Sequence, residues 1–137
     1  DIDAVAIKLP EASVFEMTDC LSARNYDGAA KIMAELLLSR ESPIKLIAII
    51  SQQMRRLYAA KLVAPQGRGS ADELCALCGI KQSFAAERLL NSARRLDLNW
   101  LGFACACCAE YDYKMKSSSA DDEELLKELL ARLAIGA

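Results

Sequence analysis

Apolar side chains recur every three or four residues along most of this sequence, and that periodicity restricts the fold more than any other feature. A helix over residues 43–63 would be about 30 Å long at 1.5 Å per residue. The 137 residues contain only 3 prolines and 6 glycines, too few turn formers for a many-stranded β-sandwich. The sequence therefore predicts an all-α fold. The apolar side chains on one side of the helix over residues 43–63 are Ile44, Ile47, Ile50, Met54, Leu57 and Tyr58.

Similar stripes, separated by capping and stop signals, predict a bundle of about six to seven helices. Ser42 followed by Pro43 is a typical N-cap with proline at the first helical position. Ser70 with Glu73 three residues later has the sequence of a capping box, and Gly79 suits a left-handed helix end. The expected helices cover residues 14–25, 26–40, 43–63, 71–78, 83–96, 97–115 (or 99–115) and 122–133. Residues 4–9 alternate as in a short extended segment.

Composition excludes several classes of protein. Hydrophobic residues make up 53% and charged residues 26%, which is unlike a disordered tail. No uncharged apolar run approaches the length of a membrane-spanning helix, and a net charge of −2 excludes binding to nucleic acid through bulk positive charge alone. The absence of histidine removes the usual general base and most catalytic zinc sites. We therefore expect no catalytic residues, cofactor or membrane partner.

The distribution of charge along the chain and its first residues give two further expectations. Residues 51–100 carry eight basic and four acidic side chains, a local charge of +4, so the middle of the chain presents a mildly basic face or an ordinary solvated helix surface. The chain begins DIDAVAIKLP, without an initiator methionine or a signal segment, and is expected to be a fragment or a processed product.

The six cysteines have two interpretations. Cys75 and Cys78 form one CxxC pair, and Cys105 and Cys108 form a second, which on spacing alone resembles a four-thiolate zinc site. Both pairs lie inside predicted amphipathic helices rather than in glycine-containing turns, and Cys107 lies within the second pair. Small apolar thiols packed in a core are therefore favoured over structural zinc. With no export signal, the thiols also indicate a reducing, cytoplasmic environment.

The segment ELCALCGIKQSFAAERLLNSARR has the form of a helix-turn-helix motif. Gly79 would be at the turn, and a recognition helix would follow with Phe84 facing inward beside Leu89 and Leu90. Arg88 departs from the motif, because an apolar residue normally locks the second helix onto the first. This alternative predicts salt-dependent binding to duplex DNA through arginines of the second helix: Arg88, Arg94 and Arg95.

Four segments, in order, resemble the C-terminal part of the delta subunit of bacterial DNA polymerase III, a clamp-loader component. VFEMTDCLSARNYDGAAKIMAELL is similar to the family opening "F-x-[LM]-x-D-[AS]-[LI]", and PIKLIAIISQQMRRLYAAKLV is similar to its long helix with "Q-x-R-x-L-x-x-x-K". ELCALCGIKQSFAAERLLNSARRL and EYDYKMKSS resemble the next two segments. The residues at the motif positions include Phe15, Met17, Asp19, Gln53, Arg55, Leu57, Lys61, Asp112, Lys116 and Ser117.

The resemblance covers residues 13–135 and departs from the family at the cysteines, where alanine or leucine is usual. It implies that residues 1–12 are a linker or the tail of a preceding lid domain, and that residues 13–137 form a helical collar domain of the AAA+ clamp-loader type. The collar would join the tau/gamma and delta-prime subunits into the loader. The sliding clamp would be contacted only by an absent N-terminal domain, DNA only indirectly, and polymerase chemistry would belong to another subunit.

A collar domain needs contact residues outside its own core. Arginine and aromatic residues are the types enriched at interface hot spots. Tyr111 and Tyr113 lie about 200° apart on a helix, so one of the two should be exposed. The residues predicted to face other subunits are Arg55, Arg56, Arg94, Arg95, Trp100, Tyr111 and Tyr113.

Overall fold

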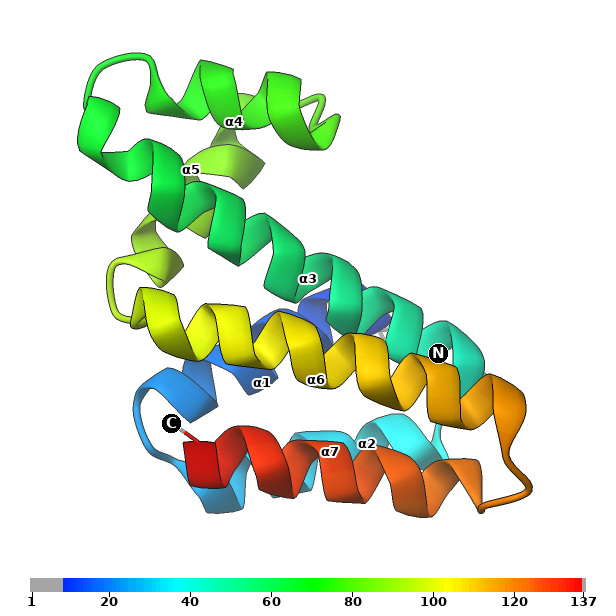
Figure 1. Cartoon of the computed structure of the whole chain (residues 1–137). Helices are drawn as coiled ribbons and strands as arrows, with labels where there is room; N and C mark the ends of the chain where they lie inside the picture. The colour runs from blue at the N-terminus through cyan, green and yellow to red at the C-terminus, as the bar shows by residue number, and fades with distance from the viewer. Residues whose placement is uncertain (1–8, 137) are drawn as a thin grey trace, which may run out of the picture.

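The structure is a computed structural model and describes residues 9–136 (Figure 1). This part of the chain contains seven α-helices, one short 3-10 helix and no strand, which confirms the predicted all-α fold. The extended segment expected at residues 4–9 lies almost wholly outside the described residues. The elements are α1 (Pro10–Ser22), α2 (Tyr26–Leu38), α3 (Pro43–Val63), η1 (Ala64–Gln66), α4 (Ser70–Cys78), α5 (Ser83–Ala93), α6 (Leu98–Ser117) and α7 (Asp122–Gly136).

Helix α1 begins at Pro10, with Leu9 as its N-cap residue. It therefore starts before residue 13, where the collar domain was expected to begin. The division of the chain at residue 12 stays a prediction.

Capping side chains place most helix starts where the sequence predicted them. The Ser42 hydroxyl accepts from the Lys45 backbone N–H, with Pro43 at the first helical position. The Asp97 carboxylate accepts from the Trp100 N–H in the same way. These side chains satisfy backbone donors that the first helical turn leaves without a partner.

The predicted capping box at the start of α4 is wrong. Gly69, in the left-handed conformation, is the N-cap residue, and the Ser70 side chain donates to the carbonyl oxygens of Val63 and Gly67. The tight turn through Gly67 and Gly69 thus directs the hydroxyl backwards to the end of α3. Gly79 ends α4 in the left-handed conformation, as predicted.

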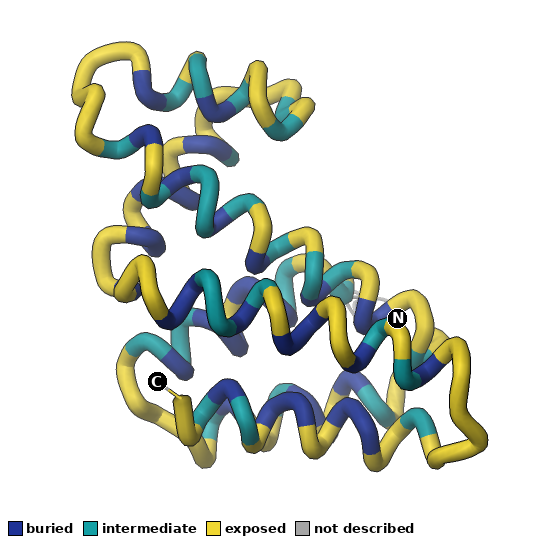
Figure 2. Tube along the Cα trace, in the orientation of Figure 1, coloured by how far each residue is buried: buried dark blue, intermediate teal, exposed yellow. Residues whose placement is uncertain are grey.

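Helix α3 runs through the centre of the bundle (Figure 1). It packs against α6 along its length, against α1 and α7 on one side and against α4 and α5 towards its C-terminal end. The chain is folded so that α1 pairs with α2 and α6 pairs with α7. Dark buried positions therefore line the inner faces of all these helices in Figure 2.

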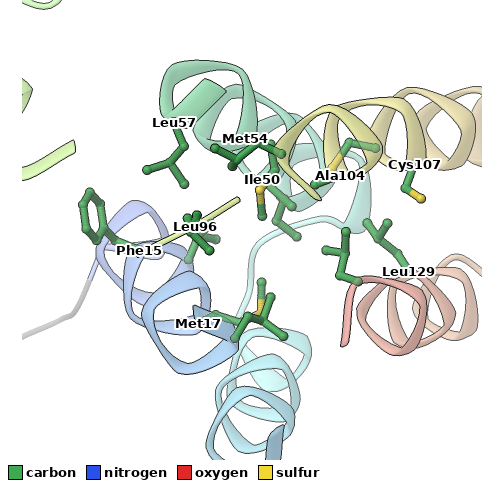
Figure 3. Packing of buried hydrophobic residues seen from close by; sticks show 14 of the residues in the cluster. Phe15, Met17, Ile50, Met54, Leu57, Leu96, Ala104, Cys107 and Leu129 are labelled. Atoms are coloured by element: carbon green, nitrogen blue, oxygen red, sulfur yellow. The ribbon is translucent and has the colours of Figure 1, made fainter. Parts of the chain in front are cut away.

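The core consists mainly of the predicted apolar stripes, but Ile44 and Tyr58 of the α3 stripe are not fully buried. Ile44, in the first turn of α3, is 38% exposed. Figure 3 shows side chains from α1, α3, α6 and α7 pointing towards one another between the ribbons. Those labelled include Phe15, Met17, Ile50, Met54, Leu57, Ala104, Cys107 and Leu129.

Two of the cysteines, both on α6, pack as small apolar side chains in the core. Cys107 and Cys108 are buried in the core, and burial is the main cause that raises the pKa of both thiols. All six cysteines are free thiols. Among residues 9–136, no group of three or more cysteine or acidic side chains is arranged to hold a metal ion. Over the same range, no helix is both long enough and apolar enough to span a bilayer.

Candidate functional site

A groove of about 250 Å³ lies where α1, α3 and α5 meet; we call it the α1–α3–α5 groove. Phe15 of α1 and Leu89 of α5 contribute apolar side chains to its lining. Both are buried on the stripes that attach their helices to the core. Phe84, Arg88 and Arg56 add a large aromatic side chain and two guanidinium groups. The groove therefore combines an apolar lining with positive charge.

Stacking positions one of these charges. The Arg88 guanidinium lies 4.0 Å from the centroid of the Phe15 ring, a cation–π contact between α5 and α1. This contact explains why an arginine occupies the position where a helix-turn-helix motif would have an apolar residue. It also leaves the edge of the planar guanidinium, which carries the N–H donors, available for hydrogen bonds.

Donors outnumber acidic groups in this groove. Within the described residues, neither Arg56 nor Arg88 forms an ion pair. The amide Nε2 of Gln53, also in the lining, is buried and has no hydrogen-bond acceptor there. Glu11 is the one acidic residue in the lining. The groove thus offers hydrogen-bond donors and net positive charge.

Phe84 corrects a prediction. It was expected to face inward, but its side chain is 71% exposed. The inner face of α5 is formed by Ala86, Leu89, Leu90 and Ala93, and Phe84 lies about 200° from Ala86 around the helix. Its exposure follows from this phase, and the side chain lies at the groove instead of in the core.

Two of the residues predicted to face other subunits belong to the core. Trp100 is 6% exposed, and its indole Nε1–H donates to the Leu133 carbonyl oxygen over 3.0 Å. Tyr111 is 1% exposed, and its hydroxyl donates to the Glu128 carboxylate. The prediction that these two lie outside the core is wrong, because both belong to the stripe of α6 that packs on α7. Tyr113, by contrast, is 71% exposed, which confirms that only one of the two tyrosines faces solvent.

The other predicted contact residues are distributed over different parts of the surface. Arg56 lies in the α1–α3–α5 groove, whereas Arg55 donates to the Ser51 hydroxyl on the exposed side of α3. Arg95 is 3.5 Å from the Asp19 carboxylate of α1, and Arg94 lines a depression beside the loop before α4. The structure therefore does not bring the predicted set together. Of the other residues in the groove, Arg88 was predicted only as a DNA contact, and Phe84 and Gln53 were not in the predicted contact set.

A charged cluster on α6 and α7 has a structural role. Arg132 of α7 forms two 3.0 Å hydrogen bonds with the Glu110 carboxylate and lies over the Tyr111 ring. Lys114 approaches Glu110 to 3.1 Å. Hydrogen bonds from Arg132 and Lys114 lower the pKa of Glu110. This cluster covers the buried seam between the two helices.

A second groove, of about 470 Å³, lies between α2 and α7. Its lining is mainly apolar, with Met33, Leu37 and Leu130 among the larger side chains. Asp27 and Lys127 supply opposite charges. Because these charges balance, this groove does not favour a partner of either sign.

Comparisons with known proteins give a consistent result. The family model for the C-terminal domain of the DNA polymerase III delta subunit matches residues 11–133. The chain belongs to this family. A curated relative, DNA polymerase III subunit delta of Bacillus subtilis (strain 168), is 28% identical over 133 residues, which cover 97% of this chain and 38% of the relative.

A solved structure of the same family has the same fold. The Bacillus subtilis DNA clamp loader delta protein (YqeN) matches with a TM-score of 0.87 and 27% identity, over 96% of this chain and 38% of that one. The chain therefore spans well under half the length of the delta subunits that it matches. The comparisons favour the clamp-loader family over the helix-turn-helix alternative.

Proposed function

We propose that this delta C-terminal domain holds its subunit in the clamp loader by packing against the helical domains of other loader subunits, namely tau/gamma and delta-prime. The family match over residues 11–133 is the observation that carries the proposal. The name of the solved relative, a clamp loader delta protein, supports it. The domain's contribution is assembly, and the polymerase chemistry is carried out by another subunit.

The physical effect of such packing is to raise effective concentration. Subunits that are bound to one another through one domain have an effective concentration in the millimolar range for their other domains. Those other domains therefore stay associated and work together. In this proposal the part of the subunit that precedes this domain belongs to the AAA+ type and contacts the sliding clamp in the cytoplasm. DNA is engaged by the assembled loader. The members of the predicted contact set that are not buried stay candidates: Arg55, Arg56, Arg94, Arg95 and Tyr113.

The test uses the full-length delta subunit of the same organism and a version that lacks residues 13–137 of this sequence. Each is mixed with tau/gamma and delta-prime and analysed by light scattering on a sizing column. We expect the full-length subunit to enter a stoichiometric complex and the truncated subunit to elute apart from it. If the truncated subunit assembles equally well, the proposal is wrong. Salt-dependent binding of duplex DNA by the domain alone would instead favour the helix-turn-helix alternative.

A further inference from the structure

We propose that the α1–α3–α5 groove is the docking site for an acidic segment of a neighbouring clamp-loader subunit, which inserts an apolar side chain beside Phe84. This inference rests on the proposed function and identifies the surface and the partner chemistry that the function needs. It uses only one residue of the predicted contact set, Arg56.

Charge complementarity identifies the chemistry of the occupant. Arg56 and Arg88 present guanidinium groups without a carboxylate partner in the described part of the chain, and the buried Gln53 Nε2 lacks an acceptor. All three groups are donors. A partner carboxylate can accept two parallel N–H bonds from one guanidinium, which is the geometry that arginine provides best. An occupant rich in Asp or Glu therefore complements the groove, and a basic one does not.

Stacking prepares the groove for such a contact. The Arg88 guanidinium lies over the Phe15 ring, 4.0 Å from its centroid, at the junction of α1 and α5. Holding a long side chain in place before binding reduces the conformational entropy that is lost on association. Arg88 is thus prepositioned to bind an anion, unlike a freely rotating surface arginine.

The apolar part of the groove favours a protein over nucleic acid. Phe84 is 71% exposed beside a lining that includes Phe15, Ile49 and Leu89. Large aromatic residues next to arginine are the composition of interface hot spots. At about 250 Å³ the groove is below the roughly 300–1,000 Å³ of typical small-molecule sites, which suits one inserted side chain.

A second copy of this domain fits the groove poorly. In a two-fold symmetric dimer centred on this groove, the same patch of both chains would form the contact. Such a contact would bring Arg56 and Arg88 of one chain towards those of the other, and like charges oppose association. The occupant is therefore a different subunit, whose surface carries the carboxylates.

The experiment uses the full-length delta subunit, labelled with a fluorophore and titrated with the purified remaining subunits of the loader. Arg88→Glu reverses one charge of the groove, and Phe84→Ala removes the exposed ring. Lys31→Glu, at an exposed position of α2, makes the same charge change elsewhere, and Ile135→Ala removes an 85% exposed apolar side chain from α7. Circular dichroism melts establish that each variant is folded.

We expect Arg88→Glu and Phe84→Ala each to weaken assembly by about 30-fold or more, the loss that marks a hot-spot residue. Arg88→Lys, which keeps the charge but loses the planar fork, should weaken it less than Arg88→Glu. The two control variants should assemble like the wild type. A photo-crosslinking amino acid at position 84 should attach to a peptide of another loader subunit that has Asp or Glu beside an apolar residue.

The outcomes separate this inference from the proposed function. If wild type and all variants assemble with equal affinity, the groove is not the contact, and the docking proposal is overturned while the assembly function stands. If the wild-type subunit does not assemble at all, the proposed function fails. If Arg88→Glu leaves assembly intact and weakens DNA binding, the groove binds nucleic acid and the docking proposal is overturned.

Discussion

Replacing Trp100 with phenylalanine tests whether this residue stabilises the fold of the domain or contacts another subunit. Its indole Nε1–H donates over 3.0 Å to the Leu133 carbonyl, which lies in the last turn of α7. Carbonyl groups of a final helical turn have no partner inside the helix, so Trp100 satisfies one of them from α6. Leaving that buried carbonyl unpaired costs about 1–3 kcal/mol. The smaller ring buries a few tens of Å² less apolar surface, which adds about 1 kcal/mol.

We therefore expect Trp100→Phe to lower the free energy of unfolding by about 2–4 kcal/mol and the melting temperature by roughly 10 °C. Urea unfolding of the chain followed by circular dichroism measures this loss, and the denaturant slope should stay unchanged. Tyr113→Phe, at an exposed position of the same helix, is the matched control and should change stability by less than about 0.5 kcal/mol. A Trp100→Phe variant as stable as the wild type but defective in assembly would refute the structural role.

Two further predictions concern backbone conformation and thiol chemistry. Gly79→Ala should destabilise the chain by about 1–2 kcal/mol in a thermal melt, because the φ angle at Gly79 is +67°. Gly102→Ala, inside α6, should instead stabilise the chain by about 0.5–1 kcal/mol. Equal effects of the two substitutions would contradict the role given to the left-handed conformation of Gly79. Burial raises the pKa of the Cys108 thiol to about 12, so iodoacetamide at pH 8 should label Cys108 only after unfolding. The thiol of the unfolded chain ionises near pH 9, so the free energy of unfolding should fall as pH rises from about 9 to 12. The fall should be at most about 1.4 kcal/mol per pH unit. Cys108→Ala should remove this contribution of the thiol to the pH dependence of stability.

The helices could be predicted from the sequence because their signals are local. Stripes of apolar residues three or four apart, together with caps such as Ser42 and Asp97, require only neighbouring residues to act. The error at Ser70 has a different cause. Gly67 and Gly69 direct the chain so that the Ser70 hydroxyl reaches back to α3, and a capping-box pattern does not contain that turn.

The wrong predictions for Trp100, Tyr111 and Phe84 arose because residue type was given more weight than the position of each residue around its helix. Trp100 and Tyr111 are separated by eleven residues, three turns of a helix, and share the stripe of Ala104 and Cys108. Their burial could therefore have been predicted from spacing. Phe84 is out of phase with the inner face of α5 and could have been predicted to be exposed.

The α1–α3–α5 groove could not have been predicted from one sequence. Phe15 and Arg88 come from opposite halves of the chain and meet only because α1 and α5 both pack on α3. Neither residue carries a local signal for the other. The same holds for Gln53, whose unpaired amide becomes apparent only when the neighbouring helices are in place.

The attachment of α4 and α5 has a consequence for local unfolding. These two helices pack chiefly on the C-terminal part of α3 and on each other, while α1, α2, α6 and α7 form the remainder of the bundle (Figure 1). A pair held on one side can open without unpacking the rest, so its amide protons should exchange with solvent faster than those of α3 and α6. Phe84 and Arg88 belong to this pair. A ligand that binds only the closed form adds its binding free energy to the cost of opening, so loader assembly should slow exchange along α5 most of all.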